Sequence, residues 1–177
     1  MKFNITRTLT LCTMLAVSGW ASAHDEHESH GHDTQAIGVA GETAKVSRTV
    51  NIDMSDAMRF TPANVQAKQG ETIRFVVKNS GKVKHEFVLG TAAALKEHYE
   101  LMKKFPEMEH SDPNMVTVAP GQNGEVIWQF SKAGKIDFAC LQPGHYDAGM
   151  KGAVMVMGKK MSGHDPKMMD DHADHQH

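Results

Sequence analysis

The chain has 177 residues, a formal net charge of −2 and 40% hydrophobic residues, and it contains 13 methionines, 12 histidines and two cysteines. The basic residues form no stripe or cluster, which argues against nucleic acid as a partner. The length between the polar ends, residues 44–158, is enough for one compact domain with one core.

The first 23 residues predict a secretory signal peptide. Lys2 and Arg7 provide the positive charge at its start, an apolar run too short to span a bilayer follows, and Ala21-Ser22-Ala23 forms a cleavage site. We therefore expect export to the periplasm and no membrane span in the mature chain.

Removal of the signal peptide also removes Cys12, which leaves Cys140 as the one cysteine of the mature chain. A single cysteine cannot form an internal disulfide, and an exported protein with an odd thiol favours intermolecular pairing, a reactive role or a metal ligand. The metal is favoured here because His145 and Met150 follow at ligand spacing.

Both ends of the mature chain are rich in histidine and polar residues. Residues 24–43 and 159–177 have no apolar periodicity, and both predict disordered tails. Imidazoles suit Cu(II), and the thioethers of the second tail suit Cu(I), so the tails could scavenge copper. A solubilising linker is the alternative for the first tail.

Short runs of alternating apolar residues, separated by turn residues, dominate residues 44–158. This pattern predicts an all-β fold, an antiparallel Greek-key β-sandwich, with one helical insertion. The residues expected on the inward faces of the strands are Val50 and Ile52; Ile73, Phe75 and Val77; Val83, His85, Phe87 and Leu89; Val126, Trp128 and Phe130; and Ile136, Phe138 and Cys140. Residues 152–157 supply the last strand.

One stretch, residues 92–105, has helical periodicity instead. Leu95, Tyr99, Met102 and Phe105 recur every three or four residues, and Pro106 helps to end the helix. We expect this helix to cap an edge or an end of the sandwich.

A second group of soft and borderline metal ligands lies in and after this helix. Its members are His98, Met102, Met108, His110 and Met115. They could form an additional copper site, although a methionine in a helical stripe is more often core filler than ligand.

The pattern Cys140-x4-His145-x4-Met150, with His85 on an upstream strand, predicts the main metal site. A thiolate, two imidazoles and a weak axial thioether are the ligands of a type 1 copper centre. Zinc sites do not use thioethers, and haem attachment would need a second cysteine. The alternatives are a buried structural histidine at 85, a methionine at 150 that only packs the loop, and a nucleophile–base pair at 140 and 145.

At these residues the chain resembles the cupredoxins, the plastocyanin and azurin family of blue copper proteins. Cys140-x-x-Pro143-Gly144-His145 with Met150 resembles the copper loop of that family, and residues 84–87 resemble its upstream ligand strand. Met58-Arg-Phe60-Thr-Pro62, residues 97–102 and residues 113–115 are similar to exported bacterial cupredoxins associated with copper tolerance. The resemblance implies that His85, Cys140, His145 and Met150 bind one copper ion. Glu86, where many small carriers have Asn, and the helical insertion depart from the family pattern.

Three functions compete at this point. The first is a periplasmic copper-binding protein for copper handling and tolerance, with one-electron Cu(I)/Cu(II) chemistry and a copper exporter as its protein partner. The second is a soluble electron carrier that serves a periplasmic redox protein. The third is an enzyme, a cuprous oxidase or a reductase, which is disfavoured because the chain has no His-x-His pairs of the kind that build a trinuclear oxidase cluster.

Overall fold

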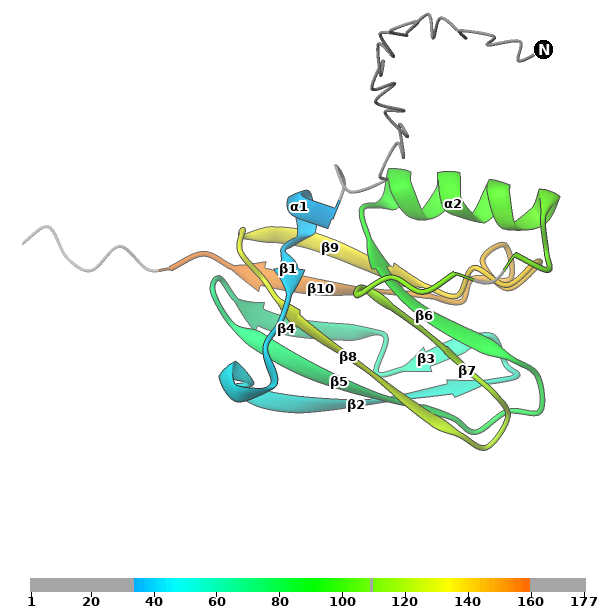
Figure 1. Cartoon of the computed structure of the whole chain (residues 1–177), viewed down its shortest axis with the longest axis horizontal. Coiled ribbons are helices and arrows are strands. Elements are labelled where there is room, and N and C mark those ends of the chain that lie inside the picture. The colour runs from blue at the N-terminus through cyan, green and yellow to red at the C-terminus, as the bar shows by residue number, and fades with distance from the viewer. Residues whose placement is uncertain (1–33, 109, 160–177) are drawn as a thin grey trace, which may run out of the picture.

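Alternating apolar residues form the strands of a two-sheet sandwich in the computed structural model, which describes residues 34–108 and 110–159 (Figure 1). The elements in chain order are α1 (Thr34–Ile37), β1 (Val39–Ala40), η2 (Thr43–Lys45), β2 (Arg48–Ser55), β3 (Arg59–Thr61), β4 (Asn64–Lys68), β5 (Thr72–Asn79), β6 (His85–Gly90), α2 (Ala92–Lys104), β7 (Met115–Val118), β8 (Asn123–Gln129), β9 (Gly134–Ala139) and β10 (Lys151–Met157).

The strands form two sheets of five, in the orders β1-β8-β5-β2-β3 and β4-β10-β9-β6-β7. The predicted β-sandwich is confirmed, but the antiparallel expectation is wrong for two strand pairs. Strands β2 and β5 run parallel, as do β4 and β10. Alternation of apolar residues reports which face of a strand is buried and carries no information about strand direction.

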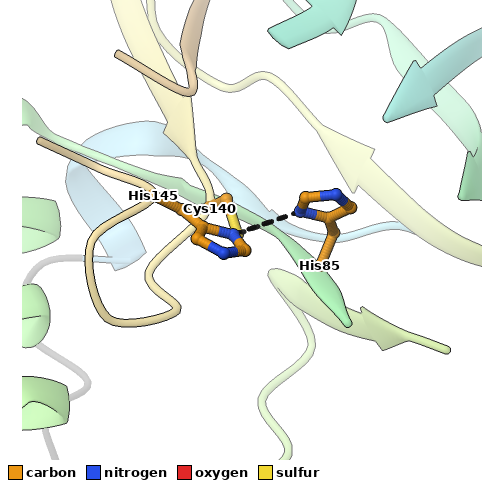
Figure 2. Close-up of side chains that lie close together, drawn as sticks. All are labelled: His85, Cys140 and His145. Carbon is orange, nitrogen blue, oxygen red and sulfur yellow. Dashed lines mark hydrogen bonds between the residues drawn. The ribbon is translucent and has the colours of Figure 1, made fainter. Parts of the chain in front are cut away.

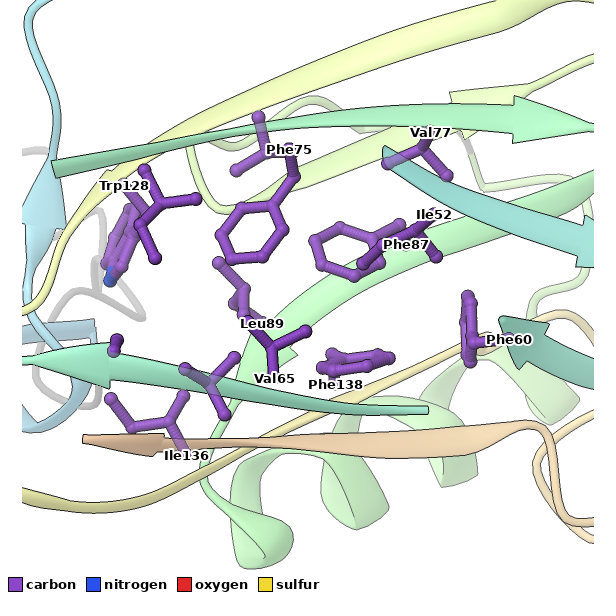
Figure 3. Close-up of a cluster of buried hydrophobic side chains, with 14 of the residues drawn as sticks. Ile52, Phe60, Val65, Phe75, Val77, Phe87, Leu89, Trp128, Ile136 and Phe138 are labelled. Carbon is purple, nitrogen blue, oxygen red and sulfur yellow. The ribbon is translucent and has the colours of Figure 1, made fainter. Parts of the chain in front are cut away.

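The main core lies between the two sheets and is dominated by phenylalanine rings (Figure 3). Phe138 is fully buried, and its ring centroid lies 5.1 Å from that of Phe60 and 5.0 Å from that of Phe87. Gly152 lies opposite Phe138 on the neighbouring strand, where a Cβ would come within 2.2 Å of the ring. The absence of a side chain at 152 therefore lets the ring pack directly on the backbone.

Strand β6 is buried on both faces because α2 covers the outer side of its sheet (Figure 1). Phe87 and Leu89 face the main core, whereas Val88 belongs to a second cluster with Leu95, Tyr99 and other residues. A strand between two apolar layers is held against movement in either direction.

The predicted helix over residues 92–105 is confirmed as α2. Thr91 caps its start, since the Thr91 hydroxyl oxygen accepts a hydrogen bond from the Ala94 amide at 3.2 Å. The expectation that Phe105 completes the apolar stripe is wrong: the helix ends at Lys104, and the Phe105 side chain is 52% exposed. The backbone leaves helical geometry at Phe105, directly before Pro106.

The folded domain begins before residue 44, which is its start as predicted from the sequence. Ile37 is 2% exposed and joins the main core, and its carbonyl accepts a hydrogen bond from the indole nitrogen of Trp128 at 3.1 Å. Gly38 follows with φ +134°, where a Cβ would meet the Gln129 carbonyl oxygen. The predicted disordered tail over residues 24–43 is therefore wrong for residues 34–43, because the buried Ile37 and the pairing of β1 with β8 hold this stretch on the domain.

The predicted signal peptide, the histidines before residue 34 and the second predicted tail from residue 160 onward lie outside the described residues. Within residues 34–108 and 110–159, no helix is long and apolar enough to cross a membrane.

Candidate metal centre

Three predicted ligands converge at one end of the sandwich (Figure 2). His85 is the first residue of β6, Cys140 directly follows β9, and His145 lies in the loop that leads to β10. The Nδ1 atoms of the two histidines are 3.2 Å apart, and Cys140 Sγ lies 3.3 Å from His145 Nδ1 and 3.9 Å from His85 Nδ1. The predicted convergence of these side chains from distant parts of the chain is confirmed.

The loop from Cys140 to Met150 is closed by its own backbone. The Cys140 amide donates to the Met150 carbonyl at 3.1 Å, and the Met150 amide donates to the His145 carbonyl at 3.0 Å. Gly144 and Gly149 have φ values of +84° and +89°, which glycine adopts without strain. Met150, the last residue of the loop, is fully buried in the main core, which also includes Cys140.

The sulfur of Cys140 also receives a backbone hydrogen bond. The Glu86 amide donates to Sγ at 3.3 Å. Position 86 is Glu where many small carriers have Asn. The hydrogen bond to the sulfur is kept all the same, because the donor is the backbone amide. The Glu86 side chain turns elsewhere, and its Oε1 accepts hydrogen bonds from Gln142 and Thr117.

These donors fit a copper ion in geometry and in chemistry. First-row metals bind imidazole nitrogen and thiolate sulfur at about 2.0–2.3 Å. The three donor atoms are 3.2, 3.3 and 3.9 Å apart, which is close enough for one ion at such bond lengths to contact all three. Burial raises the pKa of the Cys140 thiol to about 12 and lowers that of His145 below its usual value. The imidazole is consequently neutral and able to bind metal at pH 7, whereas the thiol must lose its proton.

The sequence also matches a known family over most of the described domain. The copper-binding proteins of the plastocyanin/azurin family match residues 44–157, which include all three converging donors and Met150. The chain belongs to this family. It is a cupredoxin whose His85, Cys140, His145 and Met150 cluster is consistent with type 1 copper.

Relatives of this cupredoxin include two named "Copper-resistant cuproprotein CopI". The relative from Rubrivivax gelatinosus is 48% identical over 164 residues, covering 88% of this chain and 99% of the relative. That from Pseudomonas aeruginosa is 38% identical over 157 residues, covering 72% and 84%. Among solved structures, reduced auracyanin from Roseiflexus castenholzii aligns with a TM-score of 0.55 at 20% identity, over 63% of this chain and 98% of auracyanin, and shares the fold.

The helical insertion of this cupredoxin is bonded directly to the metal-binding loop. The Tyr99 hydroxyl on α2 accepts a hydrogen bond from the Gly144 amide at 3.0 Å and donates to Asp147 at 2.9 Å. The Tyr99 ring also stacks on Tyr146, with ring centroids 5.0 Å apart. The helix thus contacts the loop on both sides of His145, through the Gly144 amide before it and the side chains of Tyr146 and Asp147 after it.

Replacing Tyr99 with phenylalanine should loosen this loop without removing the ring stack. We expect a loss of about 1–3 kcal/mol in the free energy of unfolding, because two hydrogen bonds are removed and each contributes about 0.5–1.5 kcal/mol. The Gly144 amide should exchange faster with solvent in copper-free protein, as measured by NMR. Tyr146→Phe is the matched control, since it keeps the hydrogen bonds of the Tyr99 hydroxyl. Equal exchange of the Gly144 amide in the two variants would show that Tyr99 does not hold the loop.

Copper affinity of this cupredoxin should rise with pH between about 7 and 9. The Cys140 thiol, with its pKa near 12, is protonated throughout this range and releases one proton when it binds metal. His145 is already neutral and releases none, because burial lowers its pKa. Apparent Cu(II) affinity should therefore increase about tenfold per pH unit, measured by chelator competition. A flat profile would show that no proton is released on binding, and would contradict a protonated Cys140 thiol that becomes a ligand.

The additional ligand candidates occupy two different environments. The rings of His98 and His110 lie with centroids 4.5 Å apart, and Met108 is 41% exposed nearby in sequence. Met102 and Met115 are buried in the second cluster with Leu95, Tyr99 and their neighbours, as core residues are. The structure thus brings the two histidines together and places these two methionines in packing.

Several residues around the centre were not predicted from sequence. The sequence predicts Tyr99 as a core residue and gives Arg59 only as part of a motif shared with similar proteins. In the structure the Arg59 guanidinium donates to the Ala148 carbonyl at 2.9 Å, and Asp56 lies 3.4 Å from His85. Each of these residues contacts a residue that is distant in the sequence, so no local sequence pattern predicts the contact.

Proposed function

We propose that this cupredoxin binds one type 1 copper ion and acts in the periplasm in copper handling and tolerance. The ligands would be the His85 and His145 imidazoles, the Cys140 thiolate and, as a weak axial ligand, the Met150 thioether. The approach of three donor atoms to within 4.8 Å carries the proposal. The names of the relatives from R. gelatinosus and P. aeruginosa support the tolerance role.

Bound copper would supply one-electron exchange between Cu(I) and Cu(II), and the protein would supply rigidity. His85 begins a strand that is buried on both faces, and Cys140 and His145 are bonded through the loop backbone to Met150. Donors held in this way need little rearrangement when the charge on the metal changes. This property suits both copper oxidation and electron exchange.

A complementation experiment tests the tolerance role. A bacterium that lacks this gene would be given the intact gene or the Cys140→Ser variant, and growth would be followed over a range of copper concentrations. We expect the intact gene to restore growth and the variant to fail at equal periplasmic protein levels. Equal rescue by both would refute a function that depends on this centre.

An electron carrier is the second candidate, and the exposure of His145 favours it. His145 is only half-buried, whereas His85 and Cys140 are fully buried, so the centre reaches solvent along the His145 edge. A periplasmic redox protein would be the partner of a carrier, and a copper exporter would be the partner of a copper-handling protein. Loss of respiratory electron flow on gene deletion in copper-poor medium would support the carrier, and unchanged flow would argue against it.

We also propose a second, weakly held copper ion near His98 and His110, with Met108 as a further ligand, whereas Met102 and Met115 serve the core. Both ring nitrogens of His110 are buried, and among the described residues neither has a hydrogen-bond partner. Met108 and His110 line a hollow of about 180 Å³ together with the Glu86 side chain. An imidazole and a thioether at one hollow suit copper in either oxidation state.

Copper stoichiometry tests the second ion. His110→Ala with Met108→Leu should reduce the copper bound above one equivalent and leave the type 1 spectrum intact. Met155→Leu, at an exposed methionine on β10, is the control and should change neither. Retention of the extra copper in the double variant would move the weak binding elsewhere in the chain.

A further inference from the structure

His85 presents its two ring nitrogens to different surroundings. Nδ1 points toward the donor cluster, 3.2 Å from His145 Nδ1, whereas Nε2 lies 3.4 Å from Oδ1 of Asp56. The His85 side chain is fully buried, so solvent does not reach it. A metal-binding imidazole normally donates its second N–H to a carboxylate, a carbonyl or water. Among the described residues, Asp56 is the charged group that faces Nε2.

The Asp56 carboxylate is itself held in place by the backbone. The Lys82 amide donates to its two oxygens at 3.0 and 2.8 Å, and the Val83 amide lies 3.4 Å from Oδ1. These bonds join the turn after β2 to the segment that leads into β6. The carboxylate is therefore fixed relative to the strand that begins with His85.

Gly81 leaves the space that this carboxylate occupies. A Cβ at position 81 would lie 2.1 Å from Asp56 Oδ1, a distance that side chains do not tolerate. The same oxygen faces His85 Nε2. Asp56 Oδ1 therefore occupies the space that Gly81 leaves, accepts from the backbone and faces the buried imidazole of His85.

We propose that Asp56 is a positioning residue that keeps the proton of His85 on Nε2 and thereby leaves the Nδ1 lone pair free for copper. This inference rests on the proposed role of His85 as a ligand. The bond also makes the imidazole a stronger donor, which favours Cu(II) over Cu(I). The 3.4 Å contact is at the outer limit of a hydrogen bond, and the buried Nε2 has no other hydrogen-bond partner among the described residues.

Asp56→Asn is the test, because its amide oxygen can still accept from the Lys82 and Val83 amides while the negative charge facing Nε2 is lost. Asp53→Asn is the matched control. Asp53 is on β2 and accepts a hydrogen bond from the Ser80 hydroxyl at 2.7 Å, so it bonds to the same turn without facing His85. Both variants lose one negative charge from a carboxylate that is bonded to the segment from Ser80 to Val83.

We expect Asp56→Asn to weaken Cu(II) affinity about 10–100-fold, to raise the reduction potential and to change the Cu(II) paramagnetic resonance spectrum. Asp53→Asn should match the unmodified protein in all three. Nitrogen NMR of the copper-free protein should find His85 protonated on Nε2, and a larger fraction protonated on Nδ1 in Asp56→Asn, because a neutral amide oxygen is a weaker acceptor than a carboxylate. Equal values for the two variants would overturn the positioning role.

The same measurements separate this inference from the proposed ligand set. If His85→Ala still forms the intense type 1 spectrum, then His85 is not a ligand and the proposed centre fails. If His85→Ala loses the spectrum while Asp56→Asn behaves as Asp53→Asn does, then the centre stands and only the role of Asp56 is refuted.

Discussion

Replacing Cys140 with serine is expected to abolish the intense visible absorption of the copper-loaded protein. The thiolate is the soft, covalent donor of a type 1 centre, and a serine hydroxyl cannot replace it. The substitution removes one buried sulfur and keeps nearly the same shape, so the sandwich should still fold. Absorption and paramagnetic resonance spectra, recorded with one equivalent of Cu(II), would measure the effect.

The fold of this variant provides its control. Far-ultraviolet circular dichroism of copper-free Cys140→Ser should match that of the unmodified protein, because the strands do not depend on the thiol. Any residual copper should give the weak absorption of nitrogen and oxygen ligands. An intense visible band that survives the substitution would remove Cys140 from the centre and refute the ligand set.

Replacing Phe138 with alanine should have the largest effect on stability, about 3–5 kcal/mol of the free energy of unfolding. The Phe138 ring is fully buried between Phe60 and Phe87, so its loss leaves a cavity that the two sheets cannot close. Urea unfolding of copper-free protein, followed by the fluorescence of Trp128, would measure the change.

Phe105→Ala is the matched control for this prediction. It removes the same side chain from a site that is 52% exposed and should change stability by no more than about 0.5 kcal/mol. Similar losses in the two variants would mean that the ring at 138 is not part of a tightly packed core.

The faces of the strands could be predicted from sequence because burial repeats every second residue. Phe75 and Val77 on β5, and Val126 and Trp128 on β8, are buried as their alternation predicts. The same pattern could not predict strand direction or pairing. The parallel pairing of β2 with β5 depends on how the chain crosses between sheets, which no local pattern records.

The metal ligands could be predicted from sequence mainly because three of them lie on one loop. Cys140, His145 and Met150 share a short segment whose spacing is a signal, and His85 was found because its strand has a recognisable pattern. Asp56 and Tyr99 support that centre from the turn after β2 and from α2. Their contacts with His85 and Gly144 arise only when the sheets and the helix assemble.

The buried Ile37 has a practical consequence for protein engineering. A fragment trimmed to residues 44–157, the range that matches the family, would discard Ile37 and the carbonyl that accepts the Trp128 N–H. The indole would then face an open end of the sandwich with its polar atom unsatisfied. Shortened versions intended for spectroscopy or electrode work should therefore retain the chain from at least residue 34.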